Sequence, residues 1–205
     1  MALLVWVVTW NELMAKTCII LGGPNGSGKT TFAREFLAMQ NWPFLNADDI
    51  AAELSPDDVA AVAVSAGREF LRRLDKVITD GNDFILESTL SGLTLRRTIE
   101  RCRQAGFTVS LNMIFLSSAG ASMKRIQTRV SKGGHFVPDD DVKRRYTRSL
   151  RNFWNIYRLA VDRWRLFFNG GRSFDLVAAG EKEEVEVYNV EQFEWFQIAM
   201  RGEQP

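Results

Sequence analysis

The chain has 205 residues, enough for one ordinary α/β domain that buries a substantial core. Its 26 basic and 25 acidic residues give a net charge of +1. The protein as a whole therefore has no strong positive electrostatic potential of the kind that attracts nucleic acid or an anionic membrane. The two cysteines, Cys18 and Cys102, have neither metal-ligand nor disulfide-framework spacing, so we expect a cytoplasmic protein.

Residues 1–15 are expected to form an N-terminal extension. The apolar run Ala2 to Val8 has no basic flank before it and is too short to span a bilayer. A short membrane-surface or partner anchor is the alternative. Met14 is a possible second start, because the ordered pattern begins at Lys16. The rest of the chain, 16–205, is expected to be a single domain.

Short apolar runs, several of them rich in β-branched residues, predict five buried strands. They span 16–21, 43–46, 84–86, 109–116 and 164–168. Strands that alternate with helices form mainly parallel sheets covered on both faces. We therefore expect a three-layer α/β fold with a mainly parallel five-stranded sheet and helices on both faces. A terminal hairpin of 175–179 with 185–188 is expected after the fifth strand.

Apolar residues spaced by three and four predict the helices between these strands. They run from about 29 to before 42, 56–78, 93–104, 121–130, from 138 to about 161, and from 190 onward. Ser55 and Pro56 resemble the N-cap and first residue of the second of these helices. The segment 47–49 is expected to be the loop beyond the second strand.

A complete phosphate-binding motif lies between the first strand and the first helix. It consists of Gly23, Pro24, Asn25, Gly26, Ser27, Gly28, Lys29 and Thr30, and it matches G-x-x-x-x-G-K-[ST]. Its N–H groups and the following helix end form an anion nest, so this segment and Thr31 are expected to bind ATP within a P-loop NTPase fold. Lys29 should reach the β- and γ-phosphates, and Thr30 should bind Mg²⁺. The alternative is a glycine-rich turn without a ligand.

Acidic residues follow the second and third strands. Asp48 lies 19 residues after Lys29 and is our candidate for the base that activates an acceptor hydroxyl. Asp49 could instead cap a helix. Glu87 ends an apolar run, where a carboxylate can bind the metal or its water and contact substrate. Thr89 could bind substrate or cap the next helix.

The segment from about 121 to 151 is strongly basic and is expected to act as a lid, with nine basic residues against three acidic ones. Arginines in such a lid stabilise charge on a transferring phosphoryl group. Arg129 and one of Arg144 or Arg145 are the candidates for this catalytic role. The others are expected on a solvated helix face: Arg125, Arg148 and Arg151. His135, the single histidine, is expected either to bind substrate phosphate or to hold its glycine-rich loop.

Four blocks together resemble the zeta toxin family of P-loop kinases, in its short chromosomal form. They are 22–31, 46–50, 87–92, and Arg129 through 133–138 to 144–146. The resemblance covers roughly 16–188. It implies transfer of phosphate from ATP to a nucleotide-sugar hydroxyl, such as that of UDP-N-acetylglucosamine, with Asp48 as base and Arg129 and Arg144 or Arg145 on phosphate. It also implies a possible antitoxin partner.

Three other functions remain open. A P-loop ATPase that acts as a switch would use Glu87 to orient water. An ATP-binding protein with little turnover could be the bound half of a toxin–antitoxin pair. A kinase of another small metabolite would share the same site. A nucleic-acid kinase is not expected, because the chain lacks an extended basic surface laced with aromatic residues.

Overall fold

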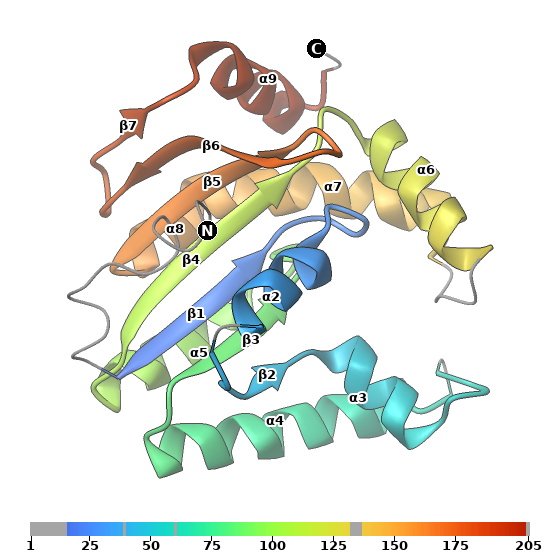
Figure 1. The fold of residues 1–205 in the computed structure, drawn as a ribbon, viewed down its shortest axis with the longest axis vertical. Helices are drawn as coiled ribbons and strands as arrows, with labels where there is room; N and C mark the ends of the chain where they lie inside the picture. Colours follow the sequence, from blue (N-terminus) through green and yellow to red (C-terminus); the bar gives the residue numbers. More distant parts are fainter. Residues whose placement is uncertain (1–15, 39, 60, 132–136, 204–205) are drawn as a thin grey trace.

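The computed structural model describes residues 16–38, 40–59, 61–131 and 137–203. In this part of the chain seven strands form one sheet (Figure 1). Their order across the sheet is β2 (Phe44–Leu45), β3 (Phe84–Ser88), β1 (Thr17–Gly22), β4 (Thr108–Phe115), β5 (Arg163–Asn169), β6 (Phe174–Gly180) and β7 (Glu186–Val187). The first five strands in this order pair in parallel, whereas β6 and β7 are antiparallel.

The mainly parallel α/β sheet is confirmed, but the count of five strands was wrong. The predicted terminal hairpin exists as β6 and β7, and it continues the sheet. Residues 174–180 pair with 164–169, because β5 would otherwise present an open edge with unpaired backbone groups.

Helices cover both faces of the sheet, as predicted. They are α2 (Lys29–Leu37), α3 (Ala47–Leu54), α4 (Ala63–Asp80), α5 (Leu95–Gln104), α6 (Ala119–Val130), α7 (Asp139–Asn152), α8 (Arg158–Ala160) and α9 (Val190–Arg201). Buried side chains of β1 alternate between the two layers: Cys18 and Ile20 pack with α4, α5, α7 and α9, whereas Ile19 and Leu21 pack with α2. Burial on both faces explains why the strands are continuous apolar runs.

Two predicted boundaries differ from the structure near the second strand. The segment 47–49 is the first turn of α3, because the Asn46 side chain caps this helix by accepting a hydrogen bond from Asp48 N. The helix predicted to start at 56 begins at Ala63. Ser55 ends α3, and its hydroxyl accepts a hydrogen bond from Asp58 N within a turn. The cap-like pattern therefore stabilises a connection instead of a helix start.

The long helix predicted from 138 is interrupted by a π-helical segment, η2 (Phe153–Tyr157), between α7 and α8. In a π-helix the wider turn brings residues five positions apart onto nearly one side. Asn152, just before this turn, and Tyr157, its last residue, both donate to one loop: Asn152 Nδ2 to Leu90 O at 2.8 Å and Tyr157 OH to Gly92 O at 2.5 Å.

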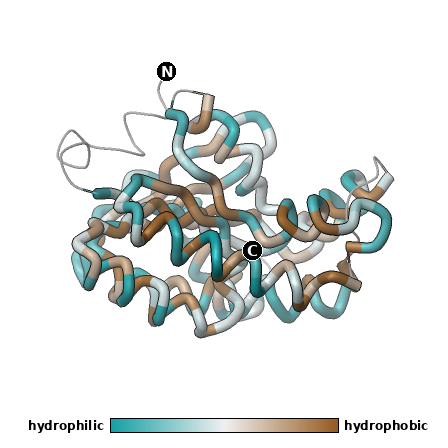
Figure 2. Tube along the Cα trace, turned by 90° about the horizontal axis from the view of Figure 1, so that it is seen from below, coloured by the Kyte–Doolittle hydropathy of each residue, from teal (hydrophilic) through white to brown (hydrophobic). Residues whose placement is uncertain are grey.

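The hydropathy along the chain agrees with this layering. Figure 2 shows apolar segments through the middle of the molecule and helices that alternate between apolar and polar residues. Within the described ranges, no helix is long and apolar enough to cross a membrane.

Candidate active site

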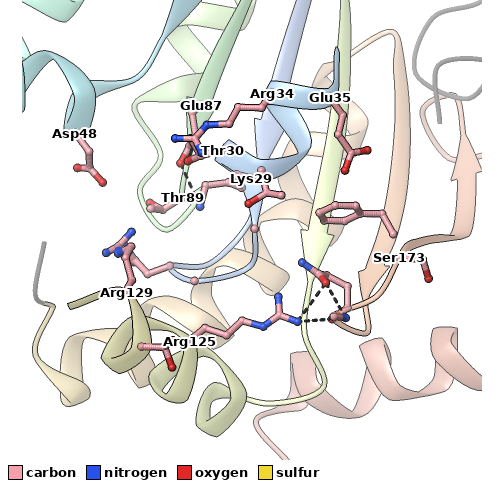
Figure 3. A pocket seen from close by; sticks show the side chains of 18 of the residues that line it. Lys29, Thr30, Arg34, Glu35, Asp48, Glu87, Thr89, Arg125, Arg129 and Ser173 are labelled. Atoms are coloured by element: carbon pink, nitrogen blue, oxygen red, sulfur yellow. Dashed lines mark hydrogen bonds and ion pairs between the residues drawn. The ribbon is translucent and has the colours of Figure 1, made fainter. Parts of the chain in front are cut away.

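A cavity of about 1190 Å³ lies where the parallel strands end (Figure 3). Parallel strands bring their carboxyl ends to one edge of the sheet, and loops at this edge form the ligand sites of open α/β folds. The predicted site residues that line the cavity are Asn25, Gly26, Gly28, Lys29, Thr30, Thr31, Asp48, Glu87, Thr89 and Arg129. The cavity therefore brings together the predicted phosphate loop, the acidic residues and one lid arginine.

The phosphate loop joins β1 to α2 and has the expected nest geometry. Gly26 and Gly28 have φ of 76° and 98°, in the left-handed region that favours glycine. Ser27 N donates to Pro24 O at 3.2 Å, which closes the turn. Because α2 begins at Lys29, its first N–H groups are left free of helical partners at the cavity.

Lys29 is buried to 5% exposure beside the loop. Its Nζ donates to Pro24 O at 3.1 Å and lies 3.5 Å from Glu87 Oε1. A buried ammonium group requires such partners, because an isolated charge away from water is costly. The two contacts hold the positive charge at the entrance to the nest.

Glu87 gathers two further polar groups on its second carboxylate oxygen. Thr30 Oγ1 donates to Glu87 Oε2 at 3.0 Å, and Asn46 Nδ2 donates to the same atom at 3.3 Å. A hydroxyl oxygen and a carboxylate oxygen this close are a donor set that fits Mg²⁺, which binds few protein oxygens and keeps waters and phosphate oxygens. Within the described ranges, no three His, Cys, Asp or Glu side chains are placed so that they could hold a metal ion together.

Two polar atoms of the loop are buried without a hydrogen-bond partner in the described part of the chain: Asn25 Oδ1 and Ser27 Oγ. Asn25 also lines the cavity. Buried polar groups are nearly always paired. The side chain of Asn25, together with the N–H groups of α2 that have no helical partner, therefore fits a polar ligand such as a nucleotide.

Asp48 and Asp49 occupy the first turn of α3, and both are exposed. Asp48 lines the cavity from the side opposite Arg125. The Asp49 carboxyl is nevertheless partly desolvated by neighbouring atoms, which raises its pKa above the usual value, and the nearby carboxylates of Glu87 and Asp48 raise this pKa further. Several negative charges therefore converge at this end of the cavity.

The predicted lid arginines are divided between two places. Arg129, on α6, lines the cavity. Arg144 and Arg145, on α7, lie outside its lining, and both bind Asp141, at 2.8 Å and 3.4 Å. The roles of these arginines stay predictions. His135 lies outside the described residues.

Several cavity residues were missed in the sequence. Arg125 was expected on a solvated face, but it lines the cavity and donates from Nη2 to Asn169 O at 3.1 Å. Asn169, at the end of β5, and the segment 171–174 complete this wall. The sequence did offer one signal for them. The strand β5 was predicted, and residues that follow the carboxyl end of a parallel strand commonly line the ligand site.

Thr89 lines the cavity from the loop after β3. Leu90, in this loop, has φ of 57°, and its side chain is buried against Gly22, where a Cβ would lie 2.4 Å from Leu90 Cδ1. Leu90 O also accepts the hydrogen bond from Asn152 described above. The loop is therefore held between the end of β1 and the α7–η2 helix.

Residues 18–152 match the profile of a family described as an AAA domain. The chain belongs to this AAA domain family. One relative by sequence is an uncharacterized protein of Haemophilus influenzae. It is 34% identical over 134 residues, which cover 65% of this chain and 95% of that protein.

Among solved structures, this AAA domain protein resembles AvrRxo1-ORF1:-ORF2 with ATP at a TM-score of 0.70 and 19% identity, covering 87% of this chain and 62% of that one. The chain thus spans less than two thirds of that structure's length. The structure of the PezAT chromosomal toxin–antitoxin system of Streptococcus pneumoniae matches with a TM-score of 0.62 and 17% identity. The match covers 92% of this chain and 80% of that one. At these identities the likeness shows the fold, an α/β P-loop kinase fold with a mixed sheet.

Proposed function

We propose that the protein is an ATP-dependent phosphotransferase that moves the γ-phosphate of ATP to a hydroxyl group of a small molecule. One observation carries the proposal: Lys29, Glu87 and Asp48 line a single cavity at the end of the sheet, on the phosphate loop, β3 and α3. A phosphate-binding cation, a metal-binding carboxylate and a second carboxylate are the groups that phosphoryl transfer requires.

The residues of the loop would bind and orient ATP. The N–H groups of 26 and 28–30 would hold the β-phosphate, and Lys29 would exchange its contact with Pro24 O for phosphate oxygens. Arg129 would stabilise negative charge on the transferring group from α6, joined by Arg144 or Arg145 if the lid segment closes. Thr30 and Glu87 would hold Mg²⁺, which neutralises charge on the phosphate oxygens when bound.

Asp48 would act as the base. Its carboxylate makes no hydrogen bond or ion pair within the described residues, so it is available to accept a proton. The acceptor oxygen would form a bond to the γ-phosphorus as the bond to ADP breaks, and its proton would pass to Asp48. Thr89 would contact the acceptor from the neighbouring loop, and His135 is proposed as a further substrate contact.

For the acceptor we propose a nucleotide sugar, with UDP-N-acetylglucosamine as the first compound to test. The support is the zeta-toxin-like sequence blocks and the fold shared with the PezAT structure. A protein partner of the antitoxin kind is part of the same proposal, since that structure comes from a toxin–antitoxin system.

A second candidate is a P-loop ATPase that acts as a switch. It is favoured by the position of the Glu87 carboxylate, 3.0 Å from the Thr30 hydroxyl, where it could orient a water molecule.

Product analysis distinguishes the two functions. The protein is incubated with Mg-ATP and, separately, with UDP-sugars, nucleosides and small alcohols, and the products are identified by mass spectrometry. We expect one phosphorylated acceptor and ADP in equal amounts. ADP release that no acceptor stimulates would support the ATPase, and tight ATP binding without turnover would reject both enzymes.

A further inference from the structure

A side chain from the end of β5 reaches the back of the phosphate loop. Asn169 Nδ2 donates a hydrogen bond of 2.8 Å to the carbonyl oxygen of Ser27, and Asn169 is only 8% exposed. Gly28 makes this approach possible, because a Cβ at that position would lie 2.5 Å from Asn169 Nδ2. The glycine before Lys29 therefore serves a close contact as well as a turn.

The orientation of the Asn169 amide is set from its other side. Its Oδ1 accepts hydrogen bonds from Gly171 N at 2.9 Å and from Arg125 Nη2 at 3.2 Å (Figure 3). Reversing the amide would face its NH₂ group toward these two donors and its oxygen toward the Ser27 carbonyl. Arg125 and Gly171 therefore direct the donor of Asn169 at the phosphate loop.

This contact fixes one peptide group of the loop. The C=O and N–H of a trans peptide point in opposite directions. With Ser27 O held toward Asn169, the N–H of Gly28 points away from Asn169 and into the nest. Rotation of this peptide changes ψ of Ser27 and φ of Gly28, and a glycine tolerates such a change; rotation would present a carbonyl oxygen to the phosphates. A repulsive oxygen would then replace an attractive N–H.

We propose that Asn169 is a positioning residue for the nucleotide and that Arg125 acts through it. Together the hydrogen bonds from Arg125 to Asn169 and from Asn169 to Ser27 keep the loop in the form that binds phosphate. The inference rests on the proposed nucleotide binding and assigns this control to residues of α6 and β5, outside the phosphate-loop motif.

The test is calorimetric titration of the full chain with MgATP, MgADP and magnesium tripolyphosphate. Asn169→Ala is expected to weaken all three by about tenfold, the equivalent of one buried hydrogen bond. Tripolyphosphate is the decisive probe, because it engages the loop without a base or ribose. Asn189→Ala is the matched control: Asn189 also binds a backbone N–H, that of Gln192, but it caps α9 away from the cavity. Its affinities should equal those of the parent.

The outcomes separate this inference from the proposed function. If the parent protein binds no MgATP, both fail. If the parent binds MgATP and Asn169→Ala binds it equally well, only the inference fails. A loss for ATP with unchanged tripolyphosphate binding would assign Asn169 to the base side of the cavity and would also overturn it. The melting temperature without ligand, compared with that of Asn189→Ala, identifies losses that come from poor folding.

A double-mutant cycle with Arg125→Met tests the role of Arg125. If Asn169→Ala folds poorly, the single variant Arg125→Met remains informative, because it leaves Asn169 in place. Arg125→Met is expected to weaken tripolyphosphate binding about threefold, by releasing the amide of Asn169. Added to Asn169→Ala, it should cause no further loss. Fully additive losses would mean that Arg125 contacts the phosphates itself. Unchanged binding in Arg125→Met would mean that the hydrogen bond from Gly171 N alone orients the Asn169 amide. Either result would overturn the proposal that Arg125 acts through Asn169.

Discussion

The two sides of the cavity differ in how firmly their side chains are held. On the phosphate side, Lys29 is 5% exposed, and Glu87 and Asn169 each make more than one polar contact. On the opposite side, Asp48 is exposed at the first turn of α3, and its carboxylate makes no hydrogen bond or ion pair within the described residues. Under the proposed function, the phosphate side would present one fixed shape to ATP, whereas the other side could change with the acceptor without unfolding the domain.

Among changes to the phosphate side, we expect the largest effect from Lys29→Ala. We expect turnover to fall by about 10⁴-fold or more, because the change removes a preorganised charge and leaves the partly buried Glu87 without its ion pair. Turnover is measured by ADP release with the acceptor present. Lys76→Ala removes an exposed lysine paired with Asp80 and serves as the control. Substantial turnover in Lys29→Ala would mean that the loop is not the phosphate site.

Asp48→Asn should separate the two sides. We expect phosphate transfer to fall about 10³-fold while the affinity for MgATP stays within about twofold, because the change removes a general base but no phosphate contact. Transfer and calorimetric affinity are measured on the same preparation. Asp49→Asn, one residue along the same turn, should keep transfer. Transfer at the parent rate in Asp48→Asn would reject this residue as the base.

The arginines show whether the lid segment belongs to the phosphate side. Arg129→Ala is expected to lower transfer about 10²-fold, since Arg129 already lines the cavity. One of Arg144→Ala and Arg145→Ala should lower it about tenfold, and Arg148→Ala should have no effect. If neither α7 variant differs from Arg148→Ala, both arginines serve only their ion pairs with Asp141.

The smallest expected effect concerns Asp49. Its pKa is raised by partial desolvation and by Glu87 and Asp48, so the folded state disfavours its charged form. This penalty is complete above the folded-state pKa, shrinks as the pH falls through that pKa, and is gone below the lower pKa of the unfolded chain. Asp49→Asn should therefore raise the free energy of unfolding by about 0.3 kcal/mol at pH 7, a value kept small by solvent screening, and should lose this advantage at acidic pH. Urea unfolding at both pH values measures it, and an equal gain at both would reject the electrostatic cause.

Sequence patterns predicted the features of the fold that depend on residues close together in the chain. The phosphate loop, the strand starting near Lys16 and the last helix from 190 each depend on neighbours within a few residues, and all were found in the sequence. The pairing of β6 with β5 was missed because an edge strand chooses a partner that its own residues do not specify.

The contacts of Asn169 show the same limit within the site. This residue binds Ser27, 142 positions away, and no spacing rule links them. The Ser55 pattern failed for another reason. Its hydroxyl does accept a backbone N–H, as predicted, but in a turn that precedes the helix start at Ala63.

The π-helical turn η2 lets this stretch of chain hold one residue more than an ordinary helical turn. If the exposed Asn155 were deleted, the wide turn would close into an α turn and the residues after it would keep nearly their present orientation. A residue added to α7 without such a turn would instead rotate everything after it by about 100°. Tyr157 would then move away from Gly92, and the loop that carries Thr89 would lose this support.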